Sequence, residues 1–259
     1  MSRIEVRDLV VRYNGHNAVD HVHLDVDVGE WLAVIGPNGA GKSTLLRAIA
    51  ALVPVASGAV TIDGSDVATL KPRDLARRVA LVPQEPELPD TMPALDYVLL
   101  GRTPHLGYWA MESRRDVDVA HESLDALGAD DLAGRPLGRL SGGERRRVVL
   151  ARAIAQDARV LLLDEPTTAL DIGHQQHVLD LVEGLRRDRG IAVVSAVHDL
   201  TLAAQYADRL ALLDHGALVA EGDAETVLTT ERLERFSGAR VAVLRGPDGA
   251  IVVAPIRQA

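Results

Sequence analysis

The chain has 259 residues, enough for one large α/β domain or two smaller ones. Its net charge of −9 argues against a nucleic-acid-binding surface, and the absence of cysteine excludes disulfides, thiolate catalysis and cysteine-based zinc sites. The first residues do not have the pattern of a signal peptide, and no apolar run approaches the roughly 18 residues that span a bilayer. We therefore expect a soluble, cytoplasmic protein in which any membrane role needs another chain.

The first third of the chain has the pattern of a β-rich region. Alternating apolar residues predict strands over residues 3–28, with turns at Asn14-Gly15 and Gly29. A continuous apolar run over 31–35 predicts a buried parallel strand. A further strand is expected over 57–63, then a short helix over 72–77 and a strand over 79–82.

A glycine-rich segment follows the strand predicted over 31–35. Residues 36–43 read Gly-Pro-Asn-Gly-Ala-Gly-Lys-Ser, a complete phosphate-loop motif between a strand and a segment of helical composition. Glycines let backbone N–H groups converge on phosphate oxygens, and the following helix N-terminus favours the anion. Lys42 would reach the β- and γ-phosphates, and the Ser43 hydroxyl would ligate Mg²⁺. We expect ATP to contact these eight residues and the adjacent Thr44, that is, Gly36, Pro37, Asn38, Gly39, Ala40, Gly41, Lys42, Ser43 and Thr44.

Helical spacing replaces alternation from residue 91 to residue 158, which predicts an inserted helical subdomain. Within it, residues 140–144 read Leu-Ser-Gly-Gly-Glu, a glycine pair that opens a helix. Backbone N–H groups at such a helix start can approach a γ-phosphate. The segment therefore suggests a second surface that closes on the nucleotide.

A second buried strand, over 160–163, ends in two carboxylates. Asp164 and Glu165 lie where open α/β sheets bind ligands, at the carboxyl edge. We expect Asp164 to hold the Mg²⁺ shell and Glu165 to orient or deprotonate the attacking water. Strands are expected again over 191–197, 209–213 and 217–220, and a small hairpin from 239 with Pro247-Asp248-Gly249 as its turn.

Together, these motifs resemble those of the ATP-binding subunit of ABC transporters over roughly residues 3–236, and Leu-Ser-Gly-Gly is the most specific of them. The resemblance implies an α/β fold, with a P-loop NTPase (RecA-like) core and an N-terminal antiparallel β subdomain. The core and β subdomain would comprise residues 1–90 and 159–238, the helical subdomain 91–158, and a hairpin tail 239–259.

The resemblance also implies a head-to-tail homodimer that sandwiches two ATP molecules. Each ATP would contact the phosphate loop of one chain and residues 141–143 of the other. Gln84 would sense the γ-phosphate and Mg²⁺, His198 would hydrogen-bond the γ-phosphate, and Tyr13 would stack on adenine. Glu144 stands where many relatives have Gln. The implied roles are catalytic for Lys42, Gln84, Glu165 and His198, Mg²⁺-binding for Ser43, Gln84 and Asp164, and ATP-binding also for Tyr13, Ser141, Gly142, Gly143, Glu144 and Asp171.

Transport partners and cargo are implied only by the resemblance. It implies two transmembrane permease subunits, a solute-binding protein acting indirectly, no nucleic acid, and a peripheral position at the cytoplasmic face of the membrane. Residues 101–107 resemble a Gly-Arg-x-Pro-His segment in ATPases that serve importers of ferric siderophores, haem and vitamin B12. We expect this segment in the subdomain that faces the membrane subunit.

Three alternatives remain beside import of chelated iron, haem or a corrinoid. Similar Gly-Arg-x-x-His segments occur in ATPases of zinc and manganese importers. A soluble ABC ATPase without a transport role would carry a long coiled-coil insertion or a second ATPase unit, and the sequence has neither pattern. A non-catalytic nucleotide-binding regulator is disfavoured because Glu165 and His198 are both present.

Overall fold

The computed structural model describes residues 2–107, 110–168, 170–246 and 249–257. The chain forms two compact units, one made of Met1–Thr69 with Ala192–Ala259 and the other of Leu70–Ile191. Both units combine strands with helices, and the central strands pair in parallel, so the predicted α/β class is confirmed. One sequence prediction concerns positions outside the described residues, namely the Pro247-Asp248 part of the predicted hairpin turn.

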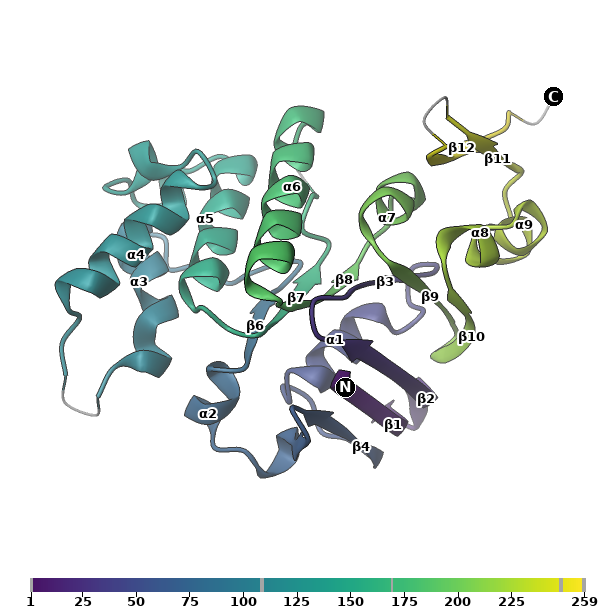
Figure 1. Cartoon of the computed structure of the whole chain (residues 1–259), viewed down its shortest axis with the longest axis horizontal. Helices are drawn as coiled ribbons and strands as arrows, with labels where there is room; N and C mark the ends of the chain where they lie inside the picture. Colours follow the sequence, from purple (N-terminus) through teal and green to yellow (C-terminus); the bar gives the residue numbers. More distant parts are fainter. Residues whose placement is uncertain (1, 108–109, 169, 247–248, 258–259) are drawn as a thin grey trace. The chain divides into compact units, whose positions relative to one another are not determined.

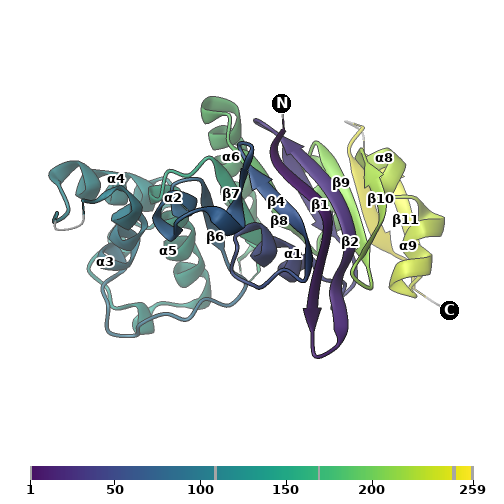
Figure 2. The same cartoon turned by 90° about the horizontal axis from the view of Figure 1, so that it is seen from below.

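The first unit begins with an antiparallel sheet. Its strands are β1 (Ser2–Tyr13), β2 (His16–Asp27), β4 (Ser57–Ile62) and β5 (Ser65–Asp66), in the order β2-β1-β4-β5, and a short 3₁₀ turn spans Val67–Thr69. Figure 2 shows β1 and β2 as long neighbouring strands. Asn14 and Gly15 join them with positive φ at both residues, as a two-residue hairpin turn requires. The pairing shifts register around Asp8, whose φ is 49°, and this lets β1 continue as one strand.

The same unit contains a mixed sheet in which the central strands are parallel. Strands β3 (Trp31–Ile35), β8 (Ala192–Ala196), β9 (Arg209–Asp214) and β10 (Ala217–Gly222) lie in the order β10-β9-β3-β8. All residues of β3 and β8 are buried, which explains their continuous apolar sequences. The polar exception, Ser195, accepts a hydrogen bond from Trp31 Nε1 at 2.8 Å.

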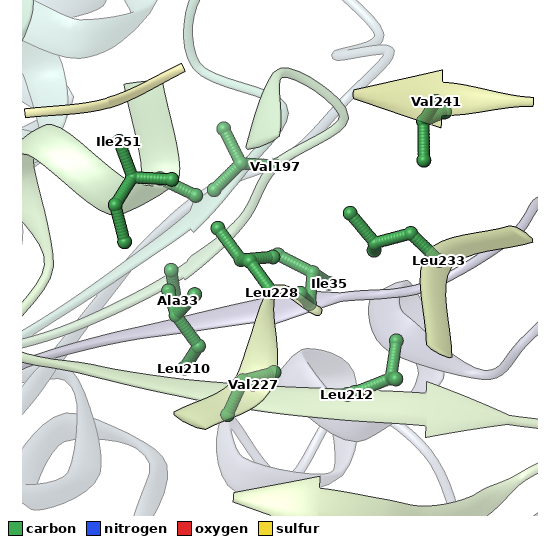
Figure 3. Packing of buried hydrophobic residues seen from close by; sticks show 11 residues of the cluster. Ala33, Ile35, Val197, Leu210, Leu212, Val227, Leu228, Leu233, Val241 and Ile251 are labelled. Atoms are coloured by element: carbon green, nitrogen blue, oxygen red, sulfur yellow. The ribbon is translucent and has the colours of Figure 1, made fainter. Parts of the chain in front are cut away.

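Helices and a hairpin complete the first unit. They are α1 (Lys42–Ile49), α7 (Leu200–Tyr206), α8 (Ala224–Val227), α9 (Thr230–Ser237), β11 (Val241–Arg245) and β12 (Ile251–Pro255). Strands β11 and β12 pair antiparallel, so the structure contains the hairpin expected after residue 239. One apolar cluster joins the hairpin to α8, α9, β3 and β9 (Figure 3).

The second unit holds a parallel pair of strands, β6 (Val79–Val82) and β7 (Val160–Asp164). Its helices are α2 (Pro72–Ala76), α3 (Ala94–Leu99), α4 (Arg114–Asp125), α5 (Gly142–Ala155) and α6 (Ile172–Arg189), with 3₁₀ turns over Leu100–His105, Asp130–Leu132 and Leu137–Arg139. Helices α3, α4 and α5 pack against one another, in teal in Figure 1. Every regular element described within 91–158 is helical, as the spacing predicts.

Candidate ATP-binding and hydrolysis site

The phosphate-loop segment requires glycine at two of its positions. Gly36 has φ of 143° and Gly41 has φ of 102°, and both values disfavour any residue with a Cβ. A Cβ on Gly36 would meet the carbonyl oxygen of Leu213, and one on Gly41 would meet that of Ala18. Gly39, by contrast, has open space on its Cβ side. The loop is therefore packed tightly at its two ends and open at its middle.

Lys42 lies at the first position of α1 and is buried, with 6% of its surface exposed. Its Nζ donates hydrogen bonds to the carbonyl oxygens of Gly36 at 2.8 Å and Pro37 at 3.0 Å. These contacts curl the ammonium group back over the loop. A cation and a helix N-terminus next to open backbone form an environment suited to a polyphosphate.

Two further predicted residues of the first unit lie at the end of a β-strand or shortly after it. Tyr13 is the last residue of β1 and leaves 41% of its surface exposed. His198 is exposed and follows β8 after the buried Val197. The next residue, Asp199, caps α7 by accepting hydrogen bonds from the backbone N–H groups of Thr201 and Leu202.

The predicted acidic pair lies at the carboxyl end of β7. Asp164 and Glu165 are buried, with 2% and 9% of their surfaces exposed. Glu165 has φ of 52°, a left-handed conformation that is uncommon for a residue with a side chain. The Thr168 hydroxyl donates to Glu165 Oε2 at 3.2 Å. Such backbone strain concentrates at functional sites, where it fixes the direction of a side chain.

Arg146 of α5 binds the backbone on both sides of this acidic pair. Its guanidinium donates to the carbonyl oxygens of Asp164 at 2.7 Å and Pro166 at 3.0 Å, and also to that of Glu165. It reaches the loop after β6 as well, through Pro83 O at 2.6 Å and Gln84 O at 3.2 Å. One side chain thus ties the exposed Gln84 to the segment that carries the two carboxylates.

Burial lowers the pKa of Arg146 to about 10, and the charges of Asp164 and Glu165 oppose that shift. The guanidinium therefore stays charged at neutral pH. Sequence reasoning missed this residue because it is one of three consecutive arginines, 145–147. The usable signal is helical spacing, since Arg146 shares a face with the buried Val149, Leu150 and Ala153.

We expect Arg146→Ala to lower the free energy of unfolding by at least about 3 kcal/mol, because several buried carbonyl groups lose a charged donor. Arg139→Ala is the matched control, since Arg139 is exposed and should change stability by less than about 0.5 kcal/mol. Urea unfolding of the two variants measures both values. A loss at position 146 no larger than at position 139 would contradict the bracing role.

The Leu-Ser-Gly-Gly-Glu segment starts α5. Ser141 is the N-cap and accepts from the backbone N–H of Glu144, whose Oε2 accepts from Ser141 N at 2.7 Å. Glu144 also binds Arg135 at 2.8 Å. These hydrogen bonds, the one from Ser141 N–H first, lower the pKa of Glu144. The cap holds Ser141 and Gly142 exposed at the helix start, where a phosphate could approach.

Asp171 also caps a helix. Its side chain accepts the backbone N–H of His174 at 2.9 Å at the start of α6, and this bond is the main cause of its lowered pKa. The carboxylate remains exposed.

Comparison with known proteins assigns the chain. The sequence pattern of the family described as ABC transporter matches residues 19–168, more than half of the chain. The chain belongs to the ABC transporter family. It is an ATP-binding, ATP-hydrolysing subunit, as the combined motifs predict.

Curated relatives cover almost the whole of this ABC subunit. The hemin import ATP-binding protein HmuV of Nocardia farcinica is 44% identical over 98% of this chain and 89% of its own length. The cobalamin import ATP-binding protein BtuD of Halobacterium salinarum is 41% identical over 98% of this chain and 63% of its own. The ferric enterobactin transport ATP-binding protein FepC of Escherichia coli is 34% identical over 99% and 95%.

Solved structures agree on the ABC fold. A metal-chelate type ABC transporter in an inward-facing conformation has a TM-score of 0.83 at 29% identity over 99% of this chain and 98% of that one. The ATP-binding cassette MJ0796, a dimer bound to ADP and Pi, has a TM-score of 0.79 at 28% identity over 85% and 98%. Both support the predicted P-loop core with β and helical parts.

The Gly-Arg-x-Pro-His segment of this ABC subunit turns inward. Arg102 is buried, forms an ion pair with Asp116 at 3.0 Å and donates to Ala155 O at 2.7 Å. A hydrogen bond from Ser113 is the main cause that lowers the pKa of Asp116 to about 2. His105 Nε2 lies 2.8 Å from Gln156 O, and a Cβ on Gly101 would meet the backbone of α5. The segment therefore joins α4 and α5, whereas its expected contact with a membrane subunit stays a prediction.

Two absences hold for the part of the chain that the structure describes. None of the helices there is both long enough and apolar enough to cross a membrane. Within the same residues, no group of three or more His, Cys, Asp or Glu side chains is arranged to hold a metal ion by itself.

Proposed function

We propose that this subunit hydrolyses MgATP in a head-to-tail homodimer and thereby drives import of a chelated-iron, haem or corrinoid compound. The observation that carries the proposal is the similarity, along nearly the entire chain, to import ATPases named for hemin, cobalamin and ferric enterobactin. The cargo would pass through two separate membrane permease subunits, fed by a solute-binding protein. The ATPase would bind those permeases at the cytoplasmic face of the membrane.

The donor set suits Mg²⁺ carried by ATP. Ser43, Gln84 and Asp164 offer only oxygen ligands, a hydroxyl, an amide and a carboxylate, which Mg²⁺ prefers. Mg²⁺ is commonly held by one or two carboxylates plus substrate phosphates, which fits the lack of a three-ligand cluster among the described residues. When bound, the ion neutralises charge that develops on the phosphates.

The protein groups have separate tasks in this proposal. The phosphate loop and Lys42 hold the β- and γ-phosphates, and Tyr13 stacks on the adenine. The carboxylate of Glu165 accepts a proton from the attacking water or orients that water. The left-handed backbone at Glu165 fixes the direction of this carboxylate. His198 hydrogen-bonds the γ-phosphate, and Gln84 senses the γ-phosphate and Mg²⁺. Residues 141–143 of the partner chain close the site with helix N–H groups.

The function is tested in a strain that lacks this chain. Growth on haem, on a ferric chelate or with cobalamin as the sole source should fail for at least one of the three and return with the wild-type gene. Lys42→Ala should not restore it, because ATP is no longer held. Lys71→Ala is the matched control, since Lys71 is exposed and is the only other lysine.

Other outcomes identify the alternatives. Normal uptake of all three compounds with a loss of zinc or manganese accumulation would favour a metal-ion importer. No uptake defect, together with recovery of the chain on ribosomes or DNA, would mean that the transport assignment is wrong.

A further inference from the structure

The β11–β12 hairpin lies against the helix that follows His198. Strand β12 contacts α7, and Val241 and Ile251 are buried in a cluster with Val197, the residue before His198 (Figure 3). The same cluster includes Ile35, the residue before the phosphate loop. The hairpin therefore shares an apolar cluster with the residues that directly precede two predicted ATP-contacting segments, the phosphate loop and His198.

A pair of hydrogen bonds fixes the hairpin to α7. The backbone N–H of Val253 donates to Thr201 Oγ1 at 3.1 Å, and that hydroxyl donates to Val253 O at 3.5 Å. Strand β12 belongs to a two-stranded sheet, so the Thr201 hydroxyl takes the place of a third strand at this point. Thr201 thus contacts the hairpin through its side chain.

The backbone of Thr201 is joined to His198 by a very short path. Asp199, adjacent to His198, accepts the N–H groups of Thr201 at 2.9 Å and Leu202 at 3.0 Å. A displacement of the first turn of α7 would move Asp199 and, through one peptide bond, His198. His198 therefore lies between two fixed neighbours, the buried Val197 before it and the capping Asp199 after it.

We propose that the β11–β12 hairpin, acting through Thr201, positions His198 for ATP hydrolysis. The proposal rests on the proposed role of His198 at the γ-phosphate. It makes Thr201 a positioning residue and gives the hairpin a part in turnover without contact to the nucleotide.

The test uses the full chain and two substitutions at one position. Thr201→Val keeps the branched shape but removes the hydroxyl, and should lower kcat by about threefold to tenfold, the weight of one or two hydrogen bonds. The KM for ATP should not change, since the phosphate loop is untouched. Thr201→Ser keeps the hydroxyl and should restore kcat. Leu244→Ala, on an exposed hairpin side chain, is the control.

Two measurements separate positioning from general damage. In a His198→Ala background, Thr201→Val should cause no further loss of kcat. The imidazole resonance of His198, assigned by its absence in His198→Ala, should shift in Thr201→Val and stay in place in Thr201→Ser and Leu244→Ala. An equal loss of kcat with and without His198, or an unmoved resonance, overturns the proposal. Wild-type turnover of His198→Ala would instead refute the catalytic role of His198. The resonance would still test whether Thr201 and the hairpin position the His198 side chain.

Discussion

Glu165→Gln should lower kcat for ATP hydrolysis by about 10²–10⁴-fold, or roughly 3–5 kcal/mol of barrier, because an amide cannot take the proton of the attacking water. The amide keeps the size of the carboxylate and can still accept from Thr168. MgATP binding should therefore persist, and the trapped nucleotide should hold two chains together. Phosphate release, nucleotide binding and gel filtration with MgATP measure the three properties.

Glu231→Gln provides the control for this loss of charge. Glu231 lies exposed in the first turn of α9, and its change should leave turnover at the wild-type level. Wild-type turnover in Glu165→Gln, or a variant that stays monomeric with MgATP, would exclude the proposed role.

Gly142→Asp should reduce hydrolysis at least about 10²-fold, because it places a negative charge where the γ-phosphate of the opposite site should lie. Ser141 and its cap are kept, and an acidic residue is favourable in the first turn of a helix, so α5 should stay folded. ATP should still bind the phosphate loop of the same chain. Gly134→Asp introduces the same charge at an exposed position with open space, and should be active.

Mixing Gly142→Asp chains with Lys42→Ala chains makes this prediction specific for a shared site. A heterodimer of the two has one intact site and one site with both defects, so hydrolysis should reappear on mixing. Loss of ATP binding by Gly142→Asp alone would instead indicate that one subunit builds the whole site.

Local patterns predicted much of the fold because the signals lie within a few residues of one another. The continuous apolar run of β3 is buried at every position, and Asn14-Gly15 forms the hairpin turn that this dipeptide favours. The need for glycine in the phosphate loop was equally predictable from the motif, since Gly36 and Gly41 both adopt conformations that disfavour side chains.

Contacts between distant segments were not predictable in the same way. Arg146 binds carbonyl groups that lie up to 63 residues away, and any residue type can present a carbonyl group, so the acceptors leave no mark in the sequence. The bond between Thr201 and Val253 spans 52 residues and also uses backbone atoms. Helices α8 and α9 were not predicted because they are short. Tertiary packing on the apolar cluster stabilises them more than helix propensity does.

The inward-facing Arg102 changes what its sequence segment can tell about cargo. A buried guanidinium that joins Asp116 to Ala155 O serves any subunit with this helical arrangement, whatever its transporter carries. A Gly-Arg-x-Pro-His segment shared by two such ATPases then indicates common architecture and ancestry. The residues that distinguish one nutrient from another have to be sought in the proteins that contact the nutrient.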